Sequence, residues 1–432
     1  MLQKGNKRII NAWAFYDWAN SVYPLVITTA IFPMFYESYA RTELADGSKI
    51  DMVEFFGIQF RNTEIYSYVI SLSFLIVSFI SPILSGIADY SDSKKSFLKF
   101  FCYLGSASCA SLYFFDIEHL ELSMLSVLFA SIGFWGSILF YNAYLPEIAE
   151  ASEHDRISAK GYSLGYIGSS LLLIINLVLI MGFDMNPRLS FLSVALWWIG
   201  FSQITYARLP NRVFSDKPKM ENKFSKGFKE LKKVWTEIKH LPIIKRYLIS
   251  FFVYSMGVQT VMLMATLFAA KEINWAEDGA KTGLIVSVLI IQFIATAGAY
   301  LFSWLSKKWG NIKALSLSLF IWIGICIGAY YIHEPIEFYI IAGVVGLVMG
   351  GIQSLSRSTY SKILPETKDH ASYFSFYDVL EKLGIVIGTF SYGLIEGITG
   401  SMRNSIFALI TFFILGLVLL YFVPKNKQLA KE

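Results

Sequence analysis

The chain has 432 residues, of which 55% are hydrophobic and only 16% are charged, and its mean hydropathy is +0.52. A soluble domain would carry roughly a quarter of its residues as Asp, Glu, Lys or Arg, so this composition excludes a soluble globular protein. The formal net charge of +5 matters less than where the charges lie along the chain.

Long apolar segments occur at regular intervals through the whole sequence. Roughly 20 apolar residues carry a helix across the ~30 Å hydrocarbon layer of a bilayer. The segments are too evenly apolar for barrel strands, in which polar and apolar residues alternate. The sequence therefore predicts an all-α membrane protein with twelve transmembrane helices, at about 13–37, 65–88, 97–115, 122–145, 159–182, 190–207, 247–270, 283–305, 314–332, 338–361, 373–396 and 405–423.

Lys and Arg residues are distributed unequally between the two sides that these spans define. If the N-terminus is cytoplasmic, the cytoplasmic segments hold 29 of the 37 basic residues. An excess of cations marks the cytoplasmic face, so we expect both termini to be cytoplasmic. The first span is too long for a signal peptide and is expected to be retained. We expect a multi-pass protein of the cell (inner/plasma) membrane that acts as a monomer.

The two halves of the chain share a short motif. The sequence Tyr-x-x-x-Leu-Pro-Glu occurs at residues 141–147 and again at 360–366, at the cytoplasmic end of the fourth span of each half. Equal span numbers and matching orientation favour a duplication with parallel topology. We therefore expect an N-terminal six-helix bundle at 1–207, a cytoplasmic connector at 208–246 and a C-terminal six-helix bundle at 247–432.

The connector contains an apolar stripe at helical spacing, surrounded by lysines. Such a pattern predicts an amphipathic helix lying on the anionic inner leaflet, with its lysines facing lipid headgroups. The stripe is formed by Phe224, Phe228, Leu231, Trp235 and Ile238. A nucleic-acid partner is not expected, because the apolar stripe has this simpler use.

The cytoplasmic turn after the second span resembles the signature loop of the major facilitator superfamily. It combines a glycine with Asp89, Lys94 and Lys95, although the glycine lies three residues before the acid instead of four. The equivalent turn in the second half has Lys307 where an acid is usual. We expect Asp89, Lys94 and Lys95 to form a latch that holds one conformational state.

A closer resemblance extends over residues 14 to 403. Segments 14–21, 156–166, 257–260 and 350–358 are similar to the autophagy-related vacuolar effluxer family, a branch of the same superfamily. This resemblance implies a twelve-helix permease of the major facilitator fold, with eukaryotic relatives linked to amino-acid export from the vacuole. Ser255 and Met256 stand where the family pattern usually has Asn-Asp, so one intramembrane carboxylate of that pattern is missing.

Few charged residues lie inside the spans, where each charge costs at least ~2.5–3.5 kcal/mol and needs a partner or a wet cavity. Asp17 lies with Tyr16 and Asn20 in the first span, and is either a carboxylate paired near the interface or part of a cavity lining. Arg357 lies with Gln353 in the tenth span, and either extends to the cytoplasmic surface or binds a carboxylate.

The eleventh span carries three charged residues within five positions. Asp378 and Lys382 are four residues apart and can pair within the helix, which leaves Glu381 as the titratable group, facing Arg357 in one arrangement. We expect proton coupling at Glu381 or Asp17, with Asp378 and Lys382 as partners. No His lies inside a predicted span, so a histidine proton relay is not expected.

These features predict a secondary active transporter that moves a small polar or zwitterionic solute, with amino acids among the candidates. The expected solute-binding residues are Tyr16, Asp17, Asn20, Asn142, Gln259, Gln353 and Arg357. No Walker loop is present and no cofactor or metal is expected, so an ion gradient, most simply of protons, is the expected energy source. The alternatives are a membrane enzyme acting on lipid-linked substrates and a non-transporting sensor.

Overall fold

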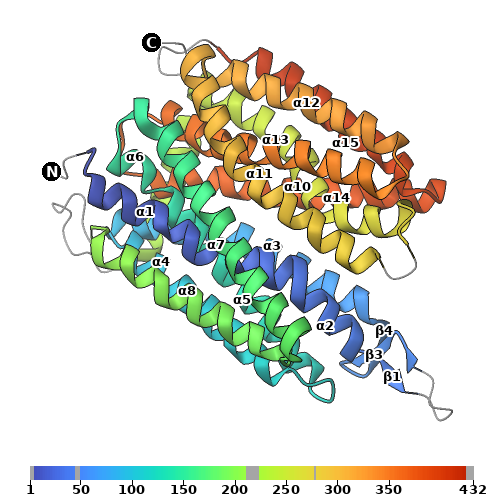
Figure 1. Cartoon of the computed structure of the whole chain (residues 1–432). Helices are drawn as coiled ribbons and strands as arrows, with labels where there is room; N and C mark the ends of the chain where they lie inside the picture. Colours follow the sequence, from blue (N-terminus) through green and yellow to red (C-terminus); the bar gives the residue numbers. More distant parts are fainter. Residues whose placement is uncertain (1–3, 44–48, 211–222, 277–278, 425–432) are drawn as a thin grey trace.

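The computed structural model describes residues 4–43, 49–210, 223–276 and 279–424. Figure 1 shows two bundles of long helices, one formed by the first half of the chain (blue to green) and the other by the second half (yellow to red). The first half contains α3 (Asn62–Tyr90), α4 (Lys94–Ser111), α5 (Leu120–Asn142), the short α6 (Leu145–Ile148), α7 (His154–Phe183) and α8 (Arg188–Arg208). The second half contains α10 (Pro242–Glu272), α11 (Ala280–Trp309), α12 (Asn311–Tyr331), α13 (Pro335–Ile363), α14 (His370–Thr399) and α15 (Met402–Tyr421).

The first predicted span is a composite helix. It starts as α1 (Lys7–Asn20), continues as the π-helix η1 (Tyr23–Ile31) and ends as α2 (Phe32–Tyr39). Pro24, at the start of η1, has no N–H to donate, and the Thr29 hydroxyl donates to the Pro24 carbonyl oxygen over 2.8 Å. π-Helical turns are usually single bulges at functional sites, so nine consecutive π-helical residues mark an unusual stretch of this span.

Ten helices in the described part of the chain are long and apolar enough to cross a membrane, by length and composition alone. The two predicted spans outside this set are the composite first helix, which is divided into three segments, and α14, which carries Asp378, Glu381 and Lys382. The helical membrane fold is confirmed. The count of twelve spans and the cytoplasmic side of the termini stay predictions.

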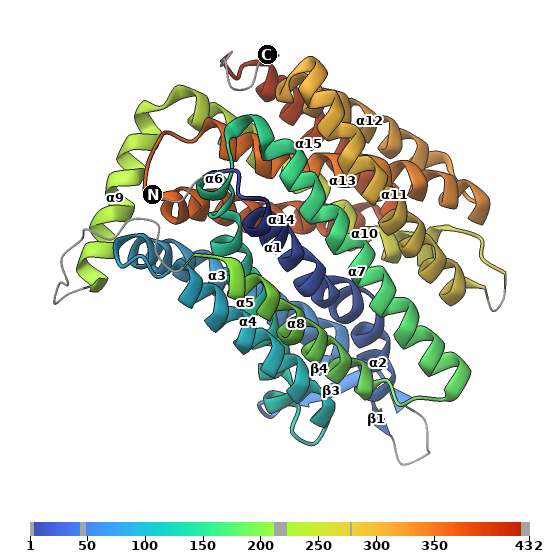
Figure 2. The same cartoon turned by 60° about the vertical axis from the view of Figure 1, so that its left-hand side comes forward.

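The two halves meet along two sets of helices. Helix α3 packs against α14, and α7 packs against α11 and α13. Figure 2 shows α7 running beside the second-half bundle, with α1 next to it on the first-half side. The start of α1 lies beside α6, where the Gly5 N–H donates to the Ile148 carbonyl oxygen over 2.9 Å. We call this end of the molecule the α6 end.

The opposite end carries two short antiparallel hairpins, which are seen at the lower right of Figure 1. Strand β1 (Thr42–Glu43) pairs with β2 (Lys49–Ile50), and β3 (Met52–Phe55) pairs with β4 (Ile58–Arg61). We call this the hairpin end. The segment between the first two predicted spans thus contains two hairpins.

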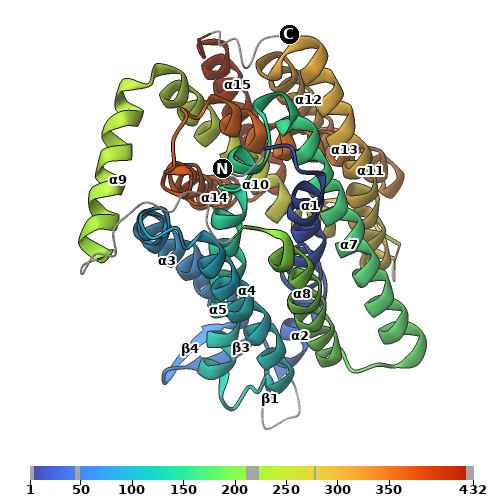
Figure 3. The ribbon, with the colours of Figure 1, turned by 90° about the vertical axis from the view of Figure 1, so that its left-hand side faces the viewer.

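The connector forms α9 (Lys223–His240), which packs against α3 and α14 (Figure 3). Val234 and Ile238 are buried in this contact, and the Lys233 amine lies 2.9 Å from the Asp369 carboxylate. Phe228 and Trp235 remain exposed. Among the stripe residues whose side chains the structure describes, Ile238 faces the protein whereas Phe228 and Trp235 are exposed, so the stripe does not face lipid as a whole. The Phe224 side chain lies outside the described residues, and contact with anionic lipid stays a prediction.

Candidate functional site

A cavity of about 260 Å³ lies between the two halves. Its lining comes from α1, η1, α3, α5 and α7 of the first half and from α10, α11, α13 and α14 of the second. The lining includes these predicted site residues: Asp17, Asn20, Asn142, Gln259, Gln353, Arg357 and Glu381. The structure therefore brings together polar residues that are up to 364 positions apart in the sequence.

Arg357 on α13 is held almost entirely by the first half of the chain. Both terminal nitrogens lie 3.3 Å from Oδ2 of Asp17, which also accepts a 2.7 Å hydrogen bond from the Tyr141 hydroxyl. Nε donates to the Ser158 hydroxyl and Nη2 to the Ser158 carbonyl oxygen, both over 2.9 Å, and Nη1 lies 3.4 Å from the Asn142 side-chain oxygen. This network joins the two halves through one side chain.

Aromatic rings surround the same guanidinium group. The Cζ atom of Arg357 lies 4.2 Å from the centre of the Tyr162 ring, 4.9 Å from that of Trp13 and 5.4 Å from that of Tyr141. Arg357 is 2% exposed, so the charge is removed from water and compensated by Asp17 and by cation–π contacts. The expected extension of Arg357 to the cytoplasmic surface does not occur in this conformation.

Helix α7 leaves room for this ion pair because it has a glycine at position 161. A Cβ atom there would lie 2.4 Å from Oδ2 of Asp17 and 3.0 Å from Nη2 of Arg357. Any other residue would force the pair or the helix to move.

The charged residues of α14 form a second group. Asp378 and Lys382 pair within the helix, as predicted from their spacing, and both are buried. The Lys382 amine lies 4.2 Å from the centre of the Trp135 ring and 3.6 Å from Oε2 of Glu381. Gln259 on α10 donates to Oε1 of Glu381 over 2.9 Å. Glu381 thus contacts Gln259 and Lys382, whereas Arg357 pairs with Asp17.

The remaining predicted residues differ in their access to the cavity. Gln353 accepts a 2.5 Å hydrogen bond from the Tyr166 hydroxyl, and the Asn20 amide nitrogen has no hydrogen-bond partner among the described residues. Tyr16 is fully buried against Tyr141 and does not belong to the cavity lining.

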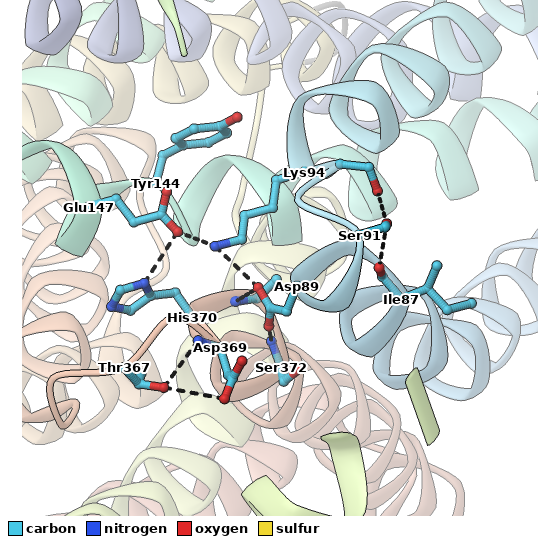
Figure 4. Close-up of polar contacts among 12 residues, drawn as sticks. Ile87, Asp89, Ser91, Lys94, Tyr144, Glu147, Thr367, Asp369, His370 and Ser372 are labelled. Carbon is cyan, nitrogen blue, oxygen red and sulfur yellow. Dashed lines mark hydrogen bonds and ion pairs between the residues drawn. The ribbon is translucent and has the colours of Figure 1, made fainter. Parts of the chain in front are cut away.

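At the α6 end, Asp89 connects α3 to the first turn of α14 (Figure 4). Its carboxylate accepts hydrogen bonds from the backbone N–H groups of Ala371 (3.2 Å) and Ser372 (2.7 Å), which are unpaired donors at a helix start. Lys94 contacts Asp89 at 3.1 Å and also pairs with Glu147, which His370 approaches to 3.2 Å.

Lys95, which was expected in the same latch, instead donates to the Leu209 carbonyl oxygen over 2.8 Å. That contact joins α4 to Leu209, the residue that follows α8, and does not involve the second half. Of the three predicted latch residues, Asp89 contacts the second half directly, Lys94 pairs with Asp89 and Glu147 within the first half, and Lys95 lies apart from this cluster.

A second cluster, which sequence reasoning missed, joins the halves on α7. Asp155, in the first turn of α7, accepts hydrogen bonds from the Ser306 hydroxyl (2.7 Å), the Asn311 amide (2.8 Å) and the Lys362 amine (2.7 Å). All three donors belong to the second half. Local spacing carries no signal for this cluster, because Lys362 occupies a variable position of the Tyr-x-x-x-Leu-Pro-Glu motif, where the first copy has Ala143.

Two helical bundles that enclose a cavity between them and contact each other at one end are the arrangement found in the major facilitator fold. Solved structures support this class. The transporter FucP in an outward conformation superposes with a TM-score of 0.70 at 14% identity, covering 98% of this chain and 99% of that chain. The human organic anion transporter MFSD10 gives 0.70 at 10% identity, covering 97% and 100%. At these identities the likeness establishes the fold alone.

Within this class, the chain belongs to the family described as "Vacuole effluxer Atg22 like", whose model matches residues 5–432. An uncharacterized MFS-type transporter of Bacillus subtilis, YxiO, is 31% identical over 426 residues, covering 96% of this chain and 95% of the relative. Autophagy-related protein 22 of Kluyveromyces lactis is 24% identical over 483 residues, covering 99% and 96%. The resemblance found in the sequence is confirmed, and the chain is a multi-pass membrane transporter.

Proposed function

We propose that this protein moves a small polar or zwitterionic solute, with amino acids among the candidates, by alternating access coupled to a proton gradient. The observation that carries this proposal is the buried Arg357–Asp17 pair, which bridges the halves at the cavity. A charge pair between two bundles forms in one state and separates in the other, so its free energy is linked to the conformational change.

The contacts at the α6 end support an assignment of the conformation. Asp89 on α3 accepts hydrogen bonds from the start of α14. Asp155 on α7 contacts residues of α11, α12 and α13. These contacts hold the two halves together at this end. With the α6 end on the cytoplasmic side, this is a state closed to the cytoplasm. Solute would enter from the outer side, or leave to it, when these contacts are formed.

A proton-coupled cycle needs a carboxylate that changes its environment between states. If the halves separate at the α6 end, Asp17 loses its ion pair with Arg357. The same movement changes the exposure of Glu381 to solvent. Asp378 stays with Lys382 on one helix and is the less suitable carrier. We therefore assign proton coupling to Asp17 or Glu381, with Asp378 and Lys382 as their supporting charges.

The bacterial relative supports a location in the cell (inner/plasma) membrane. We propose a monomer as the working unit, because the cavity lies between two halves of one chain. The enzyme and sensor alternatives are not favoured, because the relatives are transporters.

The test is uptake or efflux of a radiolabelled amino-acid mixture in proteoliposomes, with and without an imposed pH gradient. We expect gradient-dependent transport by the natural protein and none by Arg357→Ala, with membrane insertion unchanged. The matched control is Arg403→Ala, because Arg403 pairs with Glu272 at 2.8 Å within the second half. Normal transport by Arg357→Ala would remove the basis of the proposal.

A further inference from the structure

The charges around the cavity do not balance. Among the described residues, Asp17, Arg357 and Glu381 are the lining residues with charged side chains, and the Asp378–Lys382 pair lies directly behind them. With Asp17, Asp378 and Glu381 ionised, the two cations Arg357 and Lys382 leave a net charge of −1 on these five side chains, and Glu381 shares Lys382 with Asp378. A buried charge without a full counter-charge is costly, so the site favours a ligand that supplies one.

Arg357 has no free donor for an anionic group of a ligand. A guanidinium group has five N–H donors. Five contacts occupy them: Nε to the Ser158 hydroxyl, Nη1 to Asp17 and Asn142, and Nη2 to Asp17 and the Ser158 carbonyl oxygen. A carboxylate could bind Arg357 only after the contact between halves had been taken apart.

Glu381, in contrast, has acceptor capacity left. A carboxylate can accept about four hydrogen bonds. Gln259 occupies one position on Oε1, and Oε2 has no hydrogen bond to any described residue, because the Lys382 amine donates to Asp378 and stays 3.6 Å away. The Glu381 side chain is 17% exposed, compared with 6% for Asp17 and 2% for Arg357, so it is the most accessible of the three charges.

The rest of the lining suits the body of an organic cation. The rings of Tyr162 and Trp135 also line the cavity, and each already has a protein cation over one face, Arg357 and Lys382 respectively, so at most the other face of each ring can attract a cationic ligand. Aliphatic and thioether side chains complete the wall and would contact an apolar body: Ile70, Ile138, Met262, Val288, Ile291 and Met349.

We propose that Glu381, together with Gln259, binds the ammonium or guanidinium group of a small organic cation, so that the solute carries a net positive charge. This inference rests on the proposed transport function and narrows its solute class. A neutral zwitterion leaves the cavity with a net negative charge, whereas a monovalent cation brings the local sum to zero. The apolar wall accepts the remainder of the solute.

The test uses three compounds that share one side chain and differ in charge: leucinol (a cation), leucine (a zwitterion) and 4-methylpentanoate (an anion). Each is added to the purified full-length protein at the same concentration and neutral pH, and the unfolding temperature is measured. We expect leucinol to raise this temperature by about 2 °C or more, leucine to raise it less and 4-methylpentanoate to leave it unchanged. The Glu381→Gln variant should lose the leucinol effect.

The matched control is Glu396→Gln, because Glu396 lies near the other end of α14 and pairs with Lys271 at 3.1 Å. It should keep the ranking of the three compounds. A second measurement covers the case in which Glu381→Gln does not fold. Modification of Glu381 by a water-soluble carbodiimide, followed by peptide mass spectrometry, should be slowed by leucinol and not by 4-methylpentanoate.

Three results would overturn the proposal: no shift with leucinol in the natural protein, a shift with leucine or 4-methylpentanoate at least as large, or a leucinol shift that survives Glu381→Gln. These measurements need no transport. A failure of the cation site is therefore distinguishable from a failure of the transport function, which the Arg357→Ala experiment tests separately.

Discussion

The Asp155 carboxylate in the first turn of α7 lies 2.7 Å from the Lys362 amine near the end of α13, and both side chains are buried. Asn311 contacts both residues, donating to Asp155 over 2.8 Å and accepting from Lys362 over 3.1 Å. A first-half helix start is thereby fixed to three helices of the second half. This contact and the Asp89 contact hold the α6 end closed.

Replacement of Lys362 by methionine should favour opening of the α6 end. The Asp155 charge would remain buried without its cation, which destabilises the closed state. We expect at least a tenfold increase in labelling of Ser354→Cys by a maleimide added from the α6 side, which corresponds to about 1.4 kcal/mol. Cys102, Cys109 and Cys326 are buried and free, so background labelling should be low. Lys307→Met, which alters an exposed lysine on α11, is the control and should not change the rate.

Neutralisation of Asp89 should weaken the other contact. In Asp89→Asn the first-turn N–H groups of α14 lose a charged acceptor, and Lys94 loses one of its two carboxylates. An anion at a helix N-terminus contributes about 0.3–2 kcal/mol. We expect labelling of Ser354→Cys to rise by less than in Lys362→Met. Asp184→Asn, which changes an exposed carboxylate in a left-handed position after α7, serves as the control. An unchanged rate in Asp89→Asn would show that Asp89 does not contribute to closure.

A methyl group at position 161 should separate the central ion pair. The Cβ atom of Gly161→Ala would lie 2.4 Å from Oδ2 of Asp17, so Asp17, Arg357 or α7 must shift. Overpacking of this kind typically costs about 1–3 kcal/mol. We expect a lower unfolding temperature and reduced transport. Gly182→Ala lies on the same helix with open space around its Cβ position and should be neutral or slightly stabilising. Equal behaviour of the two variants would contradict the tight fit.

The Asp17–Arg357 pair should show strong coupling in a double-mutant cycle. Removing one partner leaves a buried charge and costs about 3–5 kcal/mol, whereas removing both leaves none. Asp17→Asn and Arg357→Gln should each lower the unfolding temperature more than the double variant does. Additive losses in the double variant would indicate that the two residues act independently.

The helical membrane fold could be predicted from the sequence because a helix that crosses hydrocarbon needs about 20 apolar residues, and segments of this length can be recognised in the sequence. The Asp378–Lys382 pair was also predictable, since both residues lie on one helix four positions apart. Asp17 and Arg357 were recognised as charged residues inside predicted spans. They are 340 positions apart in the sequence, and their pairing depends on how the two bundles pack against each other, which local spacing does not encode.

Asp155 escaped notice for a different reason. A carboxylate at a helix start near a membrane surface is common and usually contacts solvent, so nothing in its neighbourhood distinguishes it. The π-helix at 23–31 was equally invisible, because its apolar sequence is compatible with an ordinary α-helix. For Asp155, the contacts with the second half supply the specificity.

In both closing contacts the first half supplies the carboxylate and the second half the positive group: Asp89 meets the N–H groups at the start of α14, and Asp155 meets Lys362. Asp155 and Ala371 are each the second residue of a helix that begins with histidine, so they occupy matching places. A protein assembled from two copies of the first half would bring each Asp89 near an Asp155 carboxylate, and the repulsion between them would oppose closure of the α6 end. A protein assembled from two copies of the second half would place each Lys362 near the N-terminus of an α14 helix, which also carries partial positive charge. The contacts that close the α6 end therefore require two different halves, one that supplies carboxylates and one that supplies positive groups.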